Sequence, residues 1–350
     1  MKHSSFKIHL FKFEQAILFF SMTEIKLWYS DFYKGFEPSN NFLQELLSKH
    51  YKISLDPKEP DFLIYSCYGK DFLNYKKSVR IFYTGENLIP DFNLCDYAIG
   101  FSHLEFGDRY LRYPNFALIP DQFEELLKQR SFTVEDVQKK TYFCNFIYSN
   151  SQADPARDEF FHLLNNYKRV MSPGRHLHNA TMDIGGRFAK DWMYSKLEFQ
   201  SKCKFSIAFE NSSSPGYTTE KLMHAYITNT IPIYWGNPEV VKDFNPKSLI
   251  NCHEYGNLEE VVEKVKEIDE NNQLASEILN EPPFRENIIP TNLREETLEK
   301  FLYSIFDRDP KMAFLRSRFG TTRNYEQELV KKFHPEKPGR LYLLRRFLKL

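Results

Sequence analysis

Short apolar runs and amphipathic segments alternate along the first third of the chain. Four of the runs have the length and composition of buried strands, at residues 25–29, 62–67, 79–84 and 97–101. Between the first two runs, Leu43, Leu46 and Leu47 recur at the spacing of one helix face. Strands that alternate with helices in this way predict a parallel sheet covered on both faces.

A polar, charge-rich stretch at residues 121–140 interrupts this alternation and is the candidate domain boundary. The pattern then restarts, with strands expected at residues 141–148, 205–209 and 231–235 and helices at residues 155–165 and 219–227. Two successive units of this kind predict an α/β protein of the GT-B plan, in which two Rossmann-like domains face a cleft. We place these domains at residues 22–135 and 136–320.

The end of the chain has a different character. Residues 331–350 hold seven basic side chains and one acidic one, and apolar residues alternate with them from residue 340 onward. The predicted tail, residues 321–350, fits an amphipathic helix that contacts a membrane surface. It fits equally a terminal helix that packs on the protein body with its charged face outward.

Composition narrows the function classes. The chain of 350 residues carries 47 basic and 47 acidic side chains, so no overall field would attract nucleic acid. Its five cysteines are dispersed without a C-x-x-C pair, which favours reduced thiols in a cytosolic protein.

We expect no membrane anchor among the first residues of this sequence. The most apolar early run, residues 16–20, is far shorter than the roughly 20 residues of a transmembrane helix and lacks a small-residue cleavage site. Met22 directly precedes the first expected strand and is a second candidate for the natural start. We therefore expect a cytoplasmic protein, peripheral on the inner face of the membrane if the tail binds lipid.

The segment after the expected strand at residues 205–209 is the strongest candidate site, because ligands of open α/β sheets bind beyond the carboxyl ends of the strands. A polar loop follows this strand, and a helix opens near residue 219. Lys221 lies in its first turn, where a cation opposes the helix dipole. A bound anion would reverse that penalty, since backbone N–H groups and Lys221 would hold it together.

A second position repeats this arrangement. The expected strand at residues 141–148 is followed by Pro155, a natural first helical residue, so Arg157 falls in the first turn. An Arg side chain can hold two phosphate oxygens, while Lys supplies a point charge. Either cation alone is most simply a solvated surface charge. Found at corresponding places, Arg157 and Lys221 together predict a site for a diphosphate leaving group.

Three polar residues surround Lys221 in the sequence. Asn211 and Tyr217 flank the loop and offer hydrogen bonds to a nucleotide sugar, although Tyr217 could equally anchor the loop. Glu220 could pair with Lys221 or accept a hydrogen bond from a sugar hydroxyl. It also satisfies the ordinary preference for an acid in the first helical turn.

In the first half, Glu86 is the candidate catalytic residue. Gly85 lets the chain turn where a strand ends, which leaves Glu86 projecting toward the cleft. An inverting sugar transfer requires one general base that deprotonates the acceptor hydroxyl from the face opposite the donor. A lone glutamate in a turn is usually only solvated, so the position by itself is weak evidence.

Two motifs offer a metal site as an alternative. Asp307 and Asp309 have the D-x-D spacing with which metal-dependent transferases hold a divalent ion, but they lie late in the chain. His176 and His178 could form a pair, but they lack acidic or cysteine partners at ligand spacing. We expect no metal site and no required cofactor, and a divalent cation could at most stimulate the reaction.

Five runs together carry a resemblance to a known family. They are FYTGEN at residues 82–87, CDYAIGF at 95–101, FENS at 209–212, YTTEK at 217–221 and IPIYWG at 231–236. These runs are similar to the alpha-1,3-fucosyltransferase family, especially its bacterial members that modify lipopolysaccharide. The similarity extends from about residue 25 to about residue 302, and the signature Glu-Asn-Ser…Tyr-x-Thr-Glu-Lys is specific to that family.

The resemblance implies a GT-B fold, GDP-fucose as the donor and a glycan acceptor that contains GlcNAc and resembles N-acetyllactosamine. It implies an inverting fucosyltransferase that forms an alpha-1,3 or also an alpha-1,4 linkage in lipopolysaccharide or surface-glycan synthesis. Glu86 matches the family's proposed general base, and Arg157 and Lys221 match its diphosphate contacts. The family's other donor-site residues fall on Asn211, Tyr217 and Glu220.

Some questions stay open at this point. The loop at residues 213–216 departs from the common family pattern, which leaves its own contacts undetermined. The heptad repeats of some bacterial members are absent, which leaves the oligomeric state undetermined. The residues also fit a GT-B transferase that uses another nucleotide sugar, or an inactive protein that only binds a sugar nucleotide.

Overall fold

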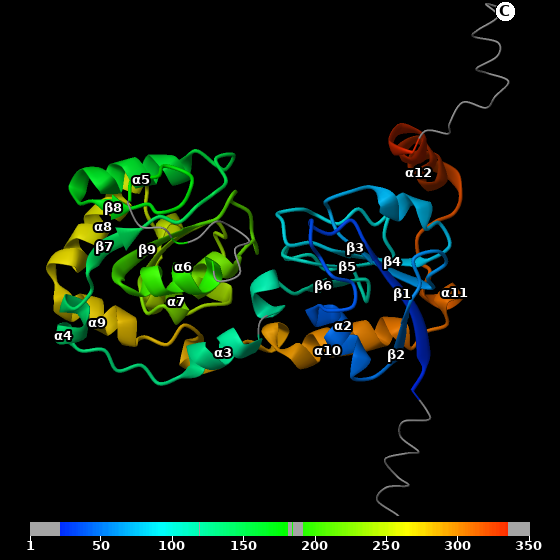
Figure 1. Ribbon diagram of the computed structural model, residues 1–350, viewed down its shortest axis with the longest axis horizontal. Helices are drawn as coiled ribbons and strands as arrows, with labels where there is room; N and C mark the ends of the chain where they lie inside the picture. The colour runs from blue at the N-terminus through cyan, green and yellow to red at the C-terminus, as the bar shows by residue number, and fades with distance from the viewer. Residues whose placement is uncertain (1–21, 119, 181–183, 185–191, 335–350) are drawn as a thin grey trace, which may run out of the picture.

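The computed structural model describes residues 22–118, 120–180, 184 and 192–334, which form two α/β halves side by side (Figure 1). Each half is built on one parallel sheet. The predicted α/β class and its two successive units are therefore confirmed.

The first sheet has six parallel strands in the order β2-β1-β3-β4-β5-β6. They are β1 (Glu24–Ser30), β2 (Lys52–Leu55), β3 (Phe62–Tyr65), β4 (Val79–Tyr83), β5 (Tyr97–Gly100) and β6 (Tyr110–Arg112). All four predicted strands are present. The pattern missed β2 and β6, because edge strands are only partly buried and carry mixed polar and apolar residues.

Helix α2 (Phe42–Ser48) connects β1 to β2 and follows the predicted pattern. Its N-cap Asn41 accepts a hydrogen bond from the backbone N–H of Gln44 at 3.0 Å. The side chains of Leu43, Leu46 and Leu47 are buried, which confirms the predicted apolar face.

The second sheet has five parallel strands in the order β11-β10-β9-β7-β8. They are β7 (Tyr142–Asn145), β8 (Val170–Met171), β9 (Cys203–Phe209), β10 (Ile231–Trp235) and β11 (Ile250–Asn251). The helices of this half are α4 (Val134–Gln138), α5 (Ala156–Tyr167), α6 (Trp192–Ser201), α7 (Glu220–Ile227), α8 (Leu258–Glu270) and α9 (Asn272–Asn280). Every residue of the central strand β9 is buried, which explains its near-continuous apolar run.

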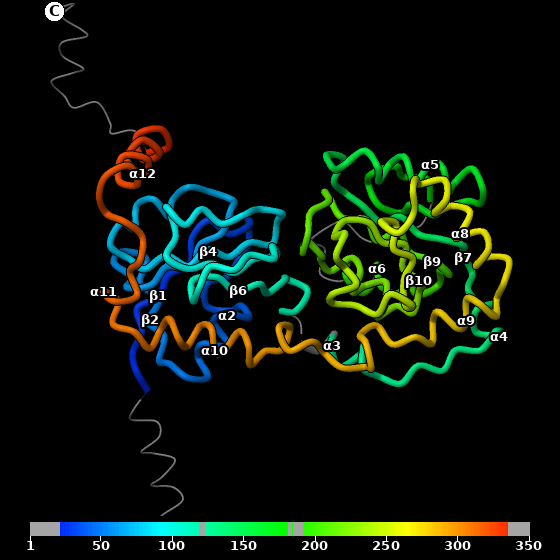
Figure 2. Tube along the Cα trace, turned by 180° about the vertical axis from the view of Figure 1, so that it is seen from behind, coloured from blue at the N-terminus to red at the C-terminus, as the bar shows by residue number. Residues whose placement is uncertain are grey.

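The chain returns to the first half after α9 (Figure 2). Helices α10 (Glu295–Phe306), α11 (Pro310–Ala313) and α12 (Gly320–Phe333) lie against the first sheet rather than the second. Phe306 packs on Phe62 of β3, with ring centroids 4.6 Å apart. The predicted limits of the second domain, residues 136–320, thus include a segment that the structure joins to the first half, because the apolar face of α10 completes the core of that half.

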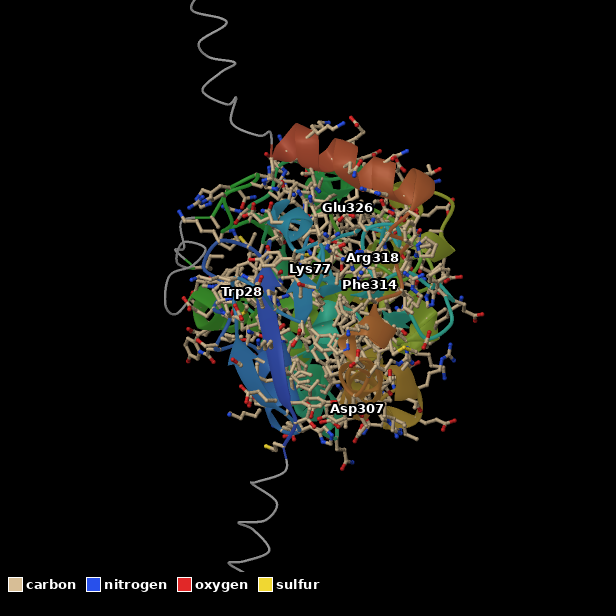
Figure 3. The ribbon with its side chains drawn as sticks, turned by 90° about the vertical axis from the view of Figure 1, so that its right-hand side faces the viewer. Trp28, Lys77, Asp307, Phe314, Arg318 and Glu326 are labelled. Carbon is tan, nitrogen blue, oxygen red and sulfur yellow. The ribbon has the colours of Figure 1, made fainter. Side chains whose placement is uncertain are left out.

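Figure 3 shows this returning segment along the outer face of the first half, with Asp307, Phe314, Arg318 and Glu326 over the same face as Trp28 and Lys77. Glu326 of α12 forms an ion pair of 2.6 Å with Arg80, whose side chain is fully buried.

The predicted tail is only partly described. Its first part is in α12, where Leu329 and Val330 pack against the core of the first half. Residues 335–350, which carry most of the basic and apolar pattern, lie outside the described residues. In the part that is described, no helix combines the length and the apolar character that crossing a membrane requires.

The two halves meet at an aromatic and charged contact. The rings of Phe116 and Phe244 are 5.4 Å apart, and Arg112 pairs with Asp243 at 2.6 Å.

Helix α3 (Pro120–Leu127) runs between the halves, and its Phe123 stacks on Phe284 with ring centroids 5.7 Å apart. These contacts fix the carboxyl ends of the strands of one half relative to the other.

Candidate functional site

Lys221 lies in the first turn of α7, as predicted, and it is held by oxygen atoms. Its Nζ is 2.9 Å from Oε2 of Glu210 and 2.8 Å from Oγ1 of Thr219, and Oε1 of Glu220 lies 3.7 Å away. Burial opposes the charged form, but Glu210 and Glu220 raise the pKa of Lys221 well above its usual value. The lysine therefore carries a fixed positive charge at the N-terminus of a helix.

Glu210, which the sequence interpretation left without a role, is the anchor of this cation. Its carboxylate is fully buried and accepts hydrogen bonds from the backbone N–H and the hydroxyl of Thr219, both at 2.7 Å. Burial raises the pKa of Glu210, and Lys221 opposes that shift. A side chain at Gly236 would come within 2.5 Å of Cγ of Glu210, so glycine is needed there.

Arg157 lies in the first turn of α5 but is not a solvated surface cation. Its side chain is 1% exposed, and its guanidinium lies 4.4 Å from the ring centroid of Tyr148. It donates to Oδ1 of Asn211 at 3.2 Å and to the carbonyl of Asn150. Its Nε is buried and has no hydrogen-bond partner among the described residues, and its nearest paired charge is Oδ1 of Asp158 at 3.9 Å. A buried cation with a donor that is not hydrogen-bonded fits an anion-binding role.

The contact between Arg157 and Asn211 joins the two predicted anion positions. Asn211 directly follows Glu210 at the end of β9, and its carbonyl accepts the backbone N–H of Asp154, just before α5. The charges of Lys221 and Arg157 also both act on Tyr148. The structure thus brings Arg157, Asn211 and Lys221 together at one edge of the second sheet.

Glu220 lies beside Lys221 and is 39% exposed. Burial opposes ionisation, but the positive charge of Lys221 and of nearby groups lowers the pKa of Glu220 to about 2. One turn later, His224 accepts a hydrogen bond from Lys196 of α6 at 3.0 Å, and burial together with Lys196 lowers the pKa of His224 to about 3. Glu220 is therefore a carboxylate able to accept from a hydroxyl.

Tyr217 occupies the space between the two halves. Its side chain is buried, and its ring meets Phe101 edge-on, with centroids 4.9 Å apart and the planes at 79°. Burial raises the pKa of Tyr217, and the negative charges of Glu210 and Glu86 add to the shift. Glu86 of the first half and Glu210 of the second half therefore both lie near this phenol.

Glu86 follows β4 and is held in a tight turn. Its backbone N–H donates to Oγ1 of Thr84 at 2.9 Å, and the hydroxyl of Thr84 donates back to its carbonyl at 3.1 Å. The phenol of Tyr68 donates to Oε1 of Glu86 at 3.0 Å. The carboxylate is partly exposed, so a hydroxyl group of an acceptor can approach it.

The candidate metal motifs have structural partners instead. Oδ1 of Asp307 accepts from the phenol of Tyr51 at 2.7 Å, and Asp309 caps α11. His176 contacts Asp158 at 2.8 Å, and His178 contacts a backbone carbonyl. Within the described ranges, no three or more His, Cys, Asp or Glu side chains are grouped to hold a metal ion.

The site as described sets two cations, the buried Arg157 and the partly buried Lys221, at one edge of the second sheet, and it presents a carboxylate from the opposite half. Sequence reasoning found Lys221 and Arg157 because both follow a strand and open a helix. It missed Glu210, Lys196 and Tyr68. A carboxylate directly after a fully buried strand was the available signal for Glu210, whereas the other two are brought to the site by tertiary structure alone.

Comparison with known proteins gives consistent matches over both halves. The family model for the N-terminal domain of alpha-(1,3)-fucosyltransferase FucT matches residues 27–119, and the C-terminal model of glycosyltransferase family 10 (fucosyltransferase) matches residues 137–280. Alpha-(1,3)-fucosyltransferase FucT of Helicobacter pylori is 35% identical over 71% of this chain and 57% of its own length. Alpha-(1,3)-fucosyltransferase B of Drosophila melanogaster is 29% identical over 59% of this chain and 50% of its own.

Solved structures agree with these matches. A crystal structure of an alpha1,3-fucosyltransferase with GDP-fucose superposes with a TM-score of 0.66 and 30% identity, over 83% of this chain and 92% of that one. A second crystal structure of an alpha1,3-fucosyltransferase gives a TM-score of 0.70 over the same shares. The chain spans about half the length of the curated relatives that it matches.

Proposed function

Because the chain belongs to the alpha-1,3-fucosyltransferase family, we propose that it transfers L-fucose from GDP-fucose to a glycan that contains N-acetylglucosamine. The observation that supports this most directly is the pair of cations at the starts of two helices beside one sheet edge, the buried Arg157 and the partly buried Lys221. A nucleoside diphosphate is a leaving group that such a pair can stabilise.

The reaction is a single displacement with inversion at the anomeric carbon of fucose. Glu86 accepts the proton of the acceptor hydroxyl while that oxygen forms the new glycosidic bond. The bond between the anomeric carbon and the diphosphate oxygen breaks, and GDP leaves with the electron pair. Lys221 and Arg157 stabilise the charge that develops on the departing diphosphate, which is worth about 3 kcal/mol per group.

The remaining donor-site residues orient the sugar nucleotide. Asn211 holds Arg157 and offers its amide, Tyr217 offers its phenol, and the ionised Glu220 accepts from a hydroxyl of ribose or fucose. Since the two cations supply the charge stabilisation, the proposal requires no metal ion and no cofactor. We further propose a cytoplasmic location, with the basic tail touching the inner face of the membrane.

The test is an acceptor screen with GDP-fucose, followed by mapping of the product linkage, with and without EDTA. We expect a fucosylated product with an N-acetyllactosamine-type acceptor, inverted anomeric configuration and turnover unaffected by EDTA. Turnover of another nucleotide sugar in preference to GDP-fucose would favour a different GT-B transferase. Tight binding of GDP with no turnover on any acceptor would identify an inactive binding protein, and activity restored only by manganese would overturn the metal-free mechanism.

A further inference from the structure

Asn87, the residue after Glu86, makes two hydrogen bonds across the boundary between the halves. Its Nδ2 donates to the hydroxyl of Ser212 at 2.7 Å, and its Oδ1 accepts from the hydroxyl of Ser214 at 2.6 Å. Both serines belong to the loop that leads from Asn211 to Tyr217 in the candidate donor site. The amide thus uses one donor and one acceptor on the same loop.

These bonds attach the loop to the residue next to the candidate base. The turn that presents Glu86 is closed within the first half by Thr84 and by the backbone N–H of Leu88, which donates to the carbonyl of Glu86 at 2.8 Å. Its carboxylate accepts a hydrogen bond from the phenol of Tyr68. Asn87 is the next residue, so bonds that restrain its side chain also limit the freedom of the backbone beside Glu86. The loop carrying Ser212 and Ser214 therefore fixes where the base stands.

Other contacts hold the two halves together without Asn87. Arg112 binds both Asp243 and the carbonyl of Gly216, at 2.6 Å and 3.2 Å. An added Cβ at Gly216 would come within 2.2 Å of the carbonyl oxygen of Phe101, which shows how closely the loop already meets the first half. Loss of the Asn87 bonds would therefore leave the halves in contact and would free only the turn at Glu86.

We propose that Asn87, Ser212 and Ser214 form a positioning clamp that couples the donor-site loop to the general base. The inference rests on the proposed function, in which Glu86 removes the acceptor proton. With the loop in place, the clamp holds the carboxylate against the donor; without the clamp, the same carboxylate samples positions from which the acceptor oxygen cannot attack in line.

The clamp predicts a particular kinetic signature. Asn87→Ala lowers kcat about tenfold, the effect expected for two lost hydrogen bonds, while the KM for GDP-fucose stays within about twofold. Ser214→Ala lowers kcat about threefold, and the double variant is no slower than Asn87→Ala alone. In the Glu86→Gln background, Asn87→Ala has no further effect, because there is no base left to position.

Ser201→Ala is the matched control, since the Ser201 hydroxyl lies in the second half outside the donor-site loop and donates to the carbonyl of Glu198 at 2.8 Å. We expect its kcat to stay within about twofold of wild type. The clamp is overturned if Asn87→Ala keeps wild-type kcat, or if it costs the same factor with and without the Glu86 carboxylate. If circular dichroism shows that Asn87→Ala folds poorly, the test uses Ser214→Ala, which removes one of the same hydrogen bonds from the second half. A wild-type kcat in Ser214→Ala then overturns the clamp.

The same data separate this inference from the proposed function. Full activity of Glu86→Gln would contradict both the role of Glu86 as general base and the clamp. A severe loss in Glu86→Gln with full activity in Asn87→Ala retains the base and removes only the clamp.

Discussion

The two halves hold their candidate residues in contrasting ways. In the second half, the partly buried Lys221 forms an ion pair with the fully buried Glu210, which also accepts two hydrogen bonds from Thr219. In the first half, Glu86 is partly exposed and depends on the phenol of Tyr68, a side chain that is itself 52% exposed. One half presents a fixed charge, and the other presents a reactive group on a turn.

This difference fits the two tasks of a sugar transfer. Stabilisation of a leaving diphosphate is most effective when the charges are in place before the reaction, because no reorganisation is then needed. A base that meets varied acceptors must instead be reachable from solvent. The rigid side chains therefore lie where the charge of the leaving group would develop, whereas the accessible carboxylate of Glu86 is positioned by a neighbouring side chain, Tyr68.

The largest expected effect is on the accessible side. Glu86→Gln should lower kcat by roughly 10²–10⁴ because the general base is lost, while the shape of the turn is kept. Calorimetric titration with GDP should show unchanged affinity, since the nucleotide contacts lie in the other half. Turnover close to wild type would show that Glu86 is not the general base, and the proposed difference between the two halves would then be wrong.

On the buried side, Lys221→Met should lower the free energy of unfolding by about 3–5 kcal/mol, because it leaves Glu210 buried without a counter-charge. The exposed pair of Lys202 and Glu198 provides the control, and Lys202→Met should cost less than about 1 kcal/mol. Chemical denaturation measures both. Equal small losses in the two variants would contradict a preformed charge site.

The same variant should make stability depend on pH. Without Lys221, the folded-state pKa of Glu210 rises further above its usual value of 4.5, so the folded protein binds a proton more readily than the unfolded chain. In Lys221→Met, the stability that protonated Glu210 contributes is fully present below about pH 4.5, and it is lost as the pH rises through the folded-state pKa of Glu210. The deficit relative to wild type should therefore be larger at pH 8 than at pH 5, and a deficit independent of pH would contradict this assignment.

Arg157→Ala should lower kcat about 100-fold, the cost of one group that stabilises developing charge. Arg169, an exposed arginine of the same half that bonds the carbonyl of Asn179, is the control. Arg169→Ala should leave kcat within about twofold. If steady-state kinetics give the same loss for both variants, the effect of Arg157 is not specific to the site.

The smallest effect concerns the meeting of the halves. Gly216→Ala should cost about 1–3 kcal/mol in stability, because alanine is strained at a φ of +89° and its Cβ meets the backbone of Phe101. Gly35 has a φ of +93° but no atom within 4 Å of an added Cβ, so Gly35→Ala measures the backbone strain alone. Thermal unfolding of both variants gives the difference, and equal losses would mean that the loop does not press on the first half.

Much of the fold was predictable because buried parallel strands are continuous apolar runs. β3, β5 and β9 are buried along their whole length and were found within a few residues. β8 and β11 have two residues each, which is too short for any periodic pattern. The return of α10 to the first sheet was missed, since an amphipathic pattern shows that a helix has an apolar face but not which core receives it.

The candidate site shows what the sequence could and could not indicate. The rule that ligands bind beyond strand ends selected Arg157 and Lys221, and the family signature selected Glu86 as the expected base. The burial of Arg157 and the pairing of Glu210 with Lys221 were not accessible, because a charged residue has the same local pattern whether its partner is water or another side chain. Asn87 shows the same limit, since its partners lie more than 120 residues away.

The path of the chain also has a consequence for biosynthesis. The carboxylate of Asp96, the residue before β5, accepts hydrogen bonds from the backbone N–H groups of Leu315 and Arg316, which are separated from it by about 220 residues. At roughly 5–20 residues per second, the ribosome completes this partner some 10–40 s after β5 has been made. During that interval we expect the nascent first half to keep an uncovered apolar face, so it is the part of the protein that chaperones would shield.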